Sequence, residues 1–150
     1  MQFDYFQMVD RLETLDLEAR EIRCRAEVPE QSTVFEGHFP GHPIVPGVFL
    51  IEAMAQASGY LLLALSSYER MPFLAGIKEA KLRNFVRPAT VLSVTAKVEH
   101  EGSGYWVTQA RCEAGGKSVA DAQIMLRSLP YPSETMRRNL REFADRIGMP

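Results

Sequence analysis

The sequence predicts an α+β fold in which an antiparallel β-sheet wraps around one long, mostly apolar helix. The helix is indicated by residues 44–65, a long apolar stretch. Five strand-like stretches follow it, at 73–77, 80–86, 91–99, 105–113 and 118–127. Glycine-rich turns at 102–104 and 115–116 separate the last three stretches, which favours antiparallel hairpins. Because an apolar helix must be covered, we expect the sheet to lie against it.

The two ends of the chain also carry regular patterns. Apolar residues at helical spacing predict a short amphipathic helix over 4–15, and alternation of apolar and charged residues predicts a strand over 17–28. In the tail, four apolar residues recur at intervals of four, three and four, which predicts a helix from about residue 131. These residues are Met136, Leu140, Phe143 and Ile147. At 150 residues, we expect a single domain over 1–150.

By length alone, the apolar stretch could also cross a membrane. However, it contains Glu52 and Gln56 and opens on Pro46 and Gly47, and a carboxylate at the centre of a bilayer is costly. A helix that is apolar nearly all round can instead form the buried axis of a soluble fold. We therefore expect no membrane insertion.

The charge and cysteine content narrow the class of protein further. The net charge is −2 and no run of Lys or Arg is present, so a nucleic-acid partner is not expected. Cys24 and Cys112 form no C-x-x-C pair, which favours buried free thiols in a reducing compartment. The sequence begins with an early acid and not with a signal-peptide pattern. These features predict a cytoplasmic protein.

Glu52 and Gln56 lie four residues apart and therefore share one face of the predicted helix. Polar groups inside a mostly apolar helix need partners. In a functional interpretation, a carboxyl group in apolar surroundings can keep its proton and donate it as a general acid. In a structural interpretation, Glu52 pairs with a basic residue at the edge of the helix.

His38 stands in a stiff loop, residues 35–47, which contains three prolines and three glycines, and it can provide the matching base. The alternative is a structural or solvated imidazole, which is the interpretation we give His42 and His100. Gly47 begins the helix, so its N–H lacks an intrahelical partner and can hold a thioester oxygen as negative charge develops there. Alternatively, Gly47 only starts the helix.

A metal site built from His38, His42 and Glu52 is disfavoured. Pro40 and Pro43 prevent the helical spacing that would direct both imidazoles at one ion. We therefore expect neither a metal nor a cofactor.

Four short motifs occur in succession over residues 37–56. They are Gly37-His38-Phe39-Pro40-Gly41, Pro43-Ile44, Pro46-Gly47-Val48 and Glu52-Ala53-Met54-Ala55-Gln56. Together they resemble the signature of the β-hydroxyacyl-[acyl-carrier-protein] dehydratases of type II fatty acid synthesis, and the fourteen-residue separation of His38 and Glu52 is similar to that family's. The similarity continues to about residue 127. The chain most resembles a side branch linked to the very-long-chain acyl groups of lipid A.

This resemblance implies a hot-dog fold and a homodimer, which in the family often assembles into a trimer of dimers. It implies an active site between two subunits, with His38 and Gly47 from one chain and Glu52 from the other, acting on a hydroxyacyl chain carried by acyl carrier protein. Gln56 would orient Glu52, and Phe73 would form an aromatic gate to the acyl tunnel. The dehydratase-isomerase branch carries Asp in place of Glu52, so the pure dehydratase branch matches better.

Two other functions remain open on the same fold. One is an acyl thioesterase, against which the spacing of His38 and Glu52 argues. The other is an acyl-binding or assembly protein that keeps the pocket without turnover.

Overall fold

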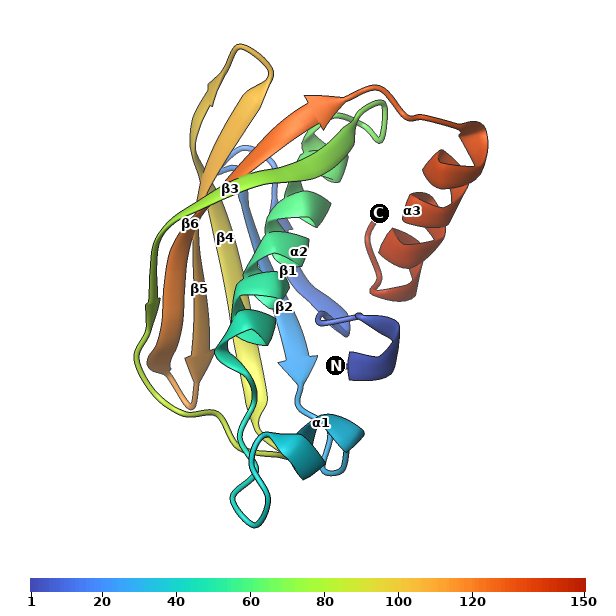
Figure 1. Ribbon diagram of the computed structural model, residues 1–150. Helices are drawn as coiled ribbons and strands as arrows, with labels where there is room; N and C mark the ends of the chain where they lie inside the picture. The colour runs from blue at the N-terminus through green and yellow to red at the C-terminus, as the bar shows by residue number, and fades with distance from the viewer.

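The computed structural model describes residues 1–150 and contains one six-stranded antiparallel sheet. Its strands lie in the order β1-β2-β4-β5-β6-β3. Their bounds are β1 Arg11–Asp16, β2 Glu21–Glu27, β3 Met71–Leu82, β4 Val91–Gly102, β5 Tyr105–Ala114 and β6 Lys117–Leu129. The sheet curves around the long helix α2, Gly47–Leu65 (Figure 1). The α+β fold expected from the sequence is confirmed.

Small side chains bring α2 close to the sheet. Ala53 and Ala57 on the helix are fully buried, as are Ala96, Ala110 and Ala122 on strands β4, β5 and β6. Larger side chains such as Leu50, Met54 and Leu61 fill the space between these alanines, and they belong to the same apolar cluster. The helix is long and apolar enough to cross a membrane, and in this fold it is the axis of the core.

Two buried polar side chains satisfy each other inside this core. The Ser58 hydroxyl on α2 donates to the Met54 carbonyl at 2.8 Å and lies 2.7 Å from the Thr108 hydroxyl on β5. Because both hydroxyls have partners, their burial avoids the cost of an unpaired polar group.

The helix predicted over residues 4–15 is wrong. The chain instead forms the short 3₁₀ helix η1, Phe3–Tyr5, then runs extended into β1, which pairs with β2. Met8 and Val9 are fully buried in this extended segment. Apolar spacing over so few residues fits either a helix or an extended strand, and pairing with β2 favours the strand.

The two strands predicted at 73–77 and 80–86 are not separate, because β3 runs through 73–77 and 80–82; residues 83–86 lie outside it and form no strand. The pairing of β3 with β6 is irregular between Lys78 and Lys81, where Glu79 has a φ of 50°. The polar residues there mark a bulge within a continuous strand instead of a turn.

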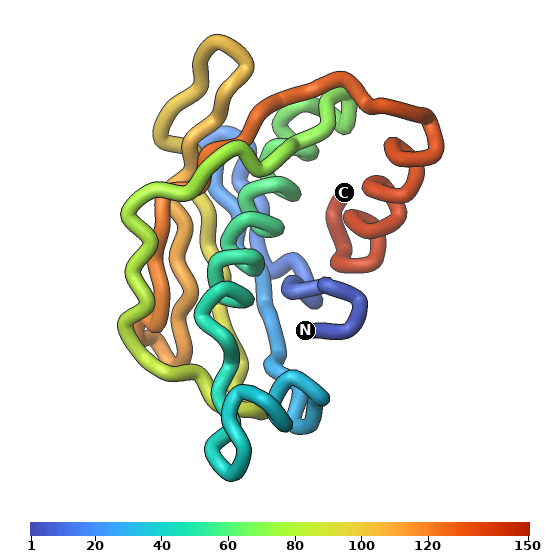
Figure 2. Tube along the Cα trace, in the orientation of Figure 1, coloured from blue at the N-terminus to red at the C-terminus, as the bar shows by residue number.

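A third helix, α3, Glu134–Arg146, follows β6 and lies on the side of α2 away from the sheet (Figure 2). The Ser133 hydroxyl caps its start by accepting from the Met136 N–H at 3.2 Å. At its other end, Ala144 of the helix and Ile147, the first residue after it, are buried in the core cluster.

Candidate active site

His38 lies directly after the short helix α1, Thr33–Gly37, at the end of the molecule where α2 begins. The Nδ1 atom of its half-buried imidazole is 3.2 Å from the Ile44 carbonyl oxygen. Because a carbonyl oxygen can only accept, Nδ1 carries the hydrogen in this contact. Neutral His38 therefore keeps an unprotonated Nε2, the form that a general base requires. The Phe39 ring stacks on the imidazole with centroids 4.2 Å apart.

Gly47 is the first residue of α2 and follows Pro46, which occupies the N-cap position. Its N–H belongs to the first turn, where backbone donors have no intrahelical acceptor. A Cβ atom at Gly47 would overlap the Leu82 Cδ1 methyl at the end of β3. The clash is with the end of a side chain and not with the backbone of β3, so the lack of a side chain at Gly47 lets Leu82 pack against this turn.

Glu52 faces away from the sheet on the next turn of α2 and is held by Gln56. The Gln56 Nε2 donates to the Glu52 Oε1 at 2.9 Å and to the Phe6 carbonyl at 2.7 Å. The Gln56 Oε1 accepts from the Met8 N–H at 2.9 Å. The Gln56 amide is thus fixed in orientation by the backbone of the N-terminal segment, and Glu52 Oε2 has no hydrogen-bond partner in the chain.

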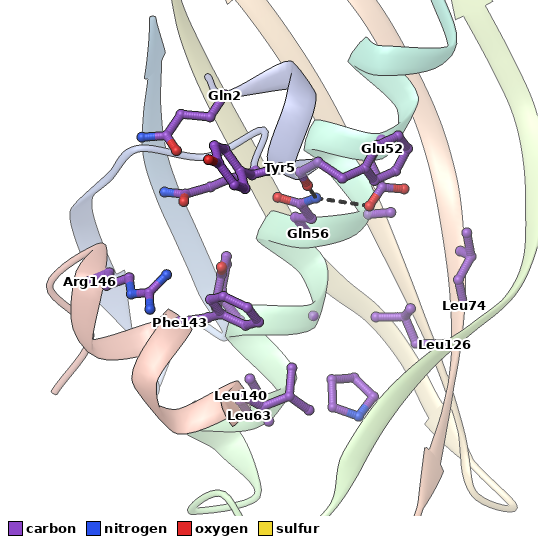
Figure 3. Close-up of a pocket in the computed structure, with 16 residues that line it drawn as sticks. Gln2, Tyr5, Glu52, Gln56, Leu63, Leu74, Leu126, Leu140, Phe143 and Arg146 are labelled. Carbon is purple, nitrogen blue, oxygen red and sulfur yellow. Dashed lines mark hydrogen bonds between the residues drawn. The ribbon is translucent and has the colours of Figure 1, made fainter. Parts of the chain in front are cut away.

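Glu52 and Gln56 line a mainly apolar cavity of about 560 Å³ (Figure 3). This volume is in the range of small-molecule sites, ~300–1,000 Å³. Residues of α2, of the N-terminal segment, of β3 and β6, and of α3 line the cavity. Its lining residues are Gln2, Tyr5, Phe6, Gln7, Glu52, Ala55, Gln56, Gly59, Tyr60, Leu63, Pro72, Leu74, Leu126, Leu140, Phe143 and Arg146.

Of the five site residues predicted from the sequence, only Glu52 and Gln56 line this cavity. His38 and Gly47 lie outside it, so one chain does not bring the histidine and the glutamate into a common cavity. Phe73 lies outside it as well and is 54% exposed, whereas its neighbour Leu74 lines the wall. Successive strand residues point to opposite faces, which explains why Leu74 and not Phe73 lines the cavity.

The sequence interpretation missed two walls of the cavity. One is the N-terminal segment with Tyr5 and Phe6, and the other is α3 with Leu140 and Phe143. The available signal was the apolar spacing in both segments, which predicts amphipathic helices but not what their apolar faces contact.

The cysteine thiols and the Tyr60 hydroxyl are not reactive near neutral pH. Burial raises the pKa of the Cys24 and Cys112 thiols to about 12, so neither is a nucleophile near neutral pH. Burial likewise raises the pKa of Tyr60, which lines the cavity, to about 12 and keeps its hydroxyl neutral. No group of three or more His, Cys, Asp or Glu side chains is placed to hold a metal ion.

Comparison with solved structures defines the class of fold. A hypothetical thioesterase protein with coenzyme A from Streptococcus pneumoniae aligns with a TM-score of 0.65 at 15% identity, covering 87% of this chain and 97% of that one. A dehydratase heterocomplex from Xenorhabdus doucetiae aligns with a TM-score of 0.64 at 14% identity, covering 91% and 90%. At such low identity these likenesses concern the fold alone, and they confirm the hot-dog fold.

Sequence comparison then defines the family. The model of the FabA-like domain matches residues 2–123. The 3-hydroxyacyl-[acyl-carrier-protein] dehydratase FabZ of Nitratiruptor sp. is 39% identical over 127 residues, covering 79% of this chain and 84% of the relative. The enzyme of the same name from Thiobacillus denitrificans is 37% identical over 124 residues, covering 80% and 85%. The chain belongs to the FabZ-type dehydratases of the FabA-like family.

Proposed function

We propose that the protein removes water from a (3R)-3-hydroxyacyl chain on acyl carrier protein to give the trans-2-enoyl thioester, in fatty acid or lipid A acyl chain synthesis. The observation that carries the proposal is the contact between His38 Nδ1 and the Ile44 carbonyl. It fixes the tautomer that leaves Nε2 free to accept a proton, on a residue that lies within the family's signature. The FabZ relatives act, by name, on carrier-bound 3-hydroxyacyl groups.

In this mechanism, His38 Nε2 removes a proton from C2 of the substrate. The Gly47 N–H stabilises the negative charge that moves onto the thioester oxygen. Glu52 gives its proton to the C3 hydroxyl, which leaves as water while the C2–C3 double bond forms. Protonated His38 and ionised Glu52 then return to their starting states by net transfer of one proton between them. Acid–base groups contribute ~10²–10⁴-fold and an oxyanion donor about 3 kcal/mol, so neither a metal nor a cofactor is required.

The active site is proposed to form between two copies of the chain. Within one chain, His38 lies outside the cavity that Glu52 lines. Strand β3 is an edge of the sheet, pairs only with β6 and exposes several large apolar side chains. They are Phe73, Leu74, Ile77 and Leu82. An unpaired apolar edge strand invites pairing with a second strand, and a two-fold interface would place β3 beside β3 of the partner.

A homodimer of this kind supports the proposed division of labour, with His38 and Gly47 from one chain facing Glu52 of the other. Phe73, exposed on β3 beside Leu74, is placed in this arrangement at the boundary between the subunits as an aromatic gate. Assembly of three such dimers into a hexamer is part of the same proposal and is measured by the mass in solution.

Mass spectrometry of the reaction with 3-hydroxyacyl-[acyl-carrier-protein] tests the proposed function. Dehydration lowers the mass of the acylated carrier by one water. A thioesterase would instead release the free hydroxy acid and leave the carrier with its free prosthetic thiol, and an acyl-binding protein would leave the mass unchanged. Either of the last two outcomes would contradict the proposal.

Mixed dimers test whether the site is shared. His38→Ala and Glu52→Gln are each expected to inactivate the homodimer. If the two residues act across the interface, a mixed dimer contains one site with both defects and one with neither. Random remixing of equal amounts then restores about a quarter of all sites, because half of the dimers are mixed and each has one intact site of two. No recovery in verified mixed dimers would reject the shared site.

A further inference from the structure

The cavity that begins at Glu52 extends well beyond the reacting groups. Along α2 its lining runs from Glu52 to Leu63, a span of eleven residues or roughly 16 Å at the helical rise. Leu63 of α2 lines the same cavity as Leu140 and Phe143 of α3 (Figure 3). The far part of the cavity is therefore walled on one side by α3.

Helix α3 is fixed to the body of the protein at its C-terminal end. Ala144, Ile147 and Met149 are buried in the core, and the Leu12 N–H of β1 donates to the Ile147 carbonyl at 2.6 Å. The Arg141 guanidinium also lies 4.2 Å from the centre of the Tyr68 ring. These contacts hold α3 at a set distance from α2.

The cavity-facing side of α3 is nevertheless left partly uncovered. Phe143 is 44% exposed although it faces α2 across the cavity, and Leu140 beside it is only half-buried. Arg146, the only charged group of the lining besides Glu52, lies exposed with its guanidinium 5.2 Å from the Phe143 ring. Its charge can thus stay in water while the aromatic ring remains against the cavity. An apolar chain in the cavity would remove Leu140 and Phe143 from water.

We propose that α3 is a wall of the acyl-chain pocket and that Leu140 and Phe143 determine the preference for long acyl chains. The proposal rests on the proposed function, because Glu52 at one end of the cavity fixes where the reacting carbons lie. The family model ends at residue 123, so α3 lies beyond the matched region. Chain-length preference is thereby assigned to a segment outside residues 2–123, which the family model matches.

Two thioesters of different chain length distinguish effects at the far end of the pocket from effects at the reacting end. The probes are 3-hydroxydodecanoyl-pantetheine, whose long chain would extend from Glu52 toward α3, and 3-hydroxybutanoyl-pantetheine, whose chain ends one carbon beyond C3. Loss of apolar contact with a substrate chain lowers kcat/KM by about 10-fold or more. Phe143→Ala and Leu140→Ala should each weaken binding and kcat/KM for the long probe by about 10-fold and leave the short probe unchanged.

Met136→Ala is the matched control, because Met136 is an exposed apolar residue of α3 that does not line the cavity. It should change neither probe. Thermal melting verifies that each variant folds, and Phe143→Leu, which keeps an apolar side chain, should retain most of the long-chain preference. If Phe143→Ala melts early, the comparison is made between Phe143→Leu and Phe143→Ser at a temperature where both are folded.

Calorimetric binding and turnover distinguish this proposal from the proposed function. The wild-type protein could bind the long probe more tightly than the short one, and Phe143→Ala could remove that difference, without turnover in either protein. This result would support α3 as a wall of the acyl-chain pocket and contradict the proposed dehydratase function. Equal effects of Phe143→Ala on both probes, or none on either, would overturn the role of α3.

Discussion

Gly47→Ala tests the proposed oxyanion donor by adding a single methyl group beside the Gly47 N–H. The added Cβ would overlap the Leu82 Cδ1 methyl and lie 3.3 Å from Cγ and 3.4 Å from Cδ2. Leu82 is 53% exposed at the end of the edge strand, so its side chain can turn away. A side chain forced off its rotamer costs ~0.5–1.5 kcal/mol, and Ala is favoured over Gly in a helix by about 1 kcal/mol at most. The free energy of unfolding should therefore change by less than ~1 kcal/mol.

The catalytic effect should be much larger than the effect on stability. If the thioester oxygen must reach the Gly47 N–H, a methyl group beside this donor prevents the contact. Removing one oxyanion donor costs about 3–4 kcal/mol, so kcat should fall by roughly 10²–10³-fold. Turnover of 3-hydroxyacyl-[acyl-carrier-protein] and urea unfolding of the same preparations measure the two quantities.

Leu82→Ala and the double variant Gly47→Ala/Leu82→Ala serve as controls. In the double variant the methyl group at position 47 has no leucine side chain to overlap. Any loss of turnover caused only by crowding against β3 is therefore relieved. We expect the double variant to stay as slow as Gly47→Ala. Recovery to within about 2-fold of Leu82→Ala would show that Gly47 is required for packing against β3 and would refute its role as oxyanion donor.

Three further predictions concern the acid, the thiols and one strained turn. Glu52→Gln keeps the size of the side chain but removes the acidic proton, so the protein should fold and bind substrate while turnover falls ~10²–10⁴-fold; a variant above half the parental rate would exclude Glu52 as the acid. Because burial holds the pKa of Cys24 and Cys112 near 12, above the ordinary 9.0, the folded state keeps these protons as pH rises while the unfolded state loses them. The free energy of unfolding should therefore fall between pH 9 and 10.5 by about 2 kcal/mol for each thiol, and Cys24→Ala/Cys112→Ala should show a shallower decline; equal slopes in urea titrations would contradict this origin. Ala89 has a φ of 59°, a region that costs an L-residue ~1–2 kcal/mol, so Ala89→Gly should raise the free energy of unfolding by about 0.5–1 kcal/mol, and a decrease would count against strain at this turn.

Local signals were sufficient to predict α2 and the hairpins. Pro46 and Gly47 mark the start of a mostly apolar run, and the glycines at 115 and 116 adopt positive φ values between β5 and β6. These elements depend on residues close together in the sequence. Strand β3 was divided wrongly because its continuity depends on β6, a partner far along the chain.

The candidate site was predictable to a similar extent. The four-residue spacing identified Glu52 and Gln56 as a pair on one helix face, and the structure places Gln56 Nε2 at 2.9 Å from Glu52 Oε1. What holds Gln56 could not be predicted, because its partners Phe6 and Met8 lie 50 and 48 residues away. The α3 wall of the cavity was also missed, since an amphipathic pattern shows that a helix has an apolar face but not what lies against it.

The wrong helix at residues 4–15 and the fixed orientation of Glu52 have one physical cause. In a helix over that segment, the Met8 N–H would donate to the Asp4 carbonyl and the Phe6 carbonyl would accept from the Asp10 N–H. Both groups would then be satisfied within the segment. In the structure, Phe6 has a φ of 55° in the turn after η1 and Met8 follows in the extended segment, so both groups are free. The Gln56 Nε2 donates to the Phe6 carbonyl, and the Gln56 Oε1 accepts from the Met8 N–H. The burial of Met8 and Val9 and the pairing of β1 with β2 stabilise this extended form. The same contacts that override the helical pattern therefore supply the donor and acceptor that hold Gln56, and through it the carboxyl group of Glu52.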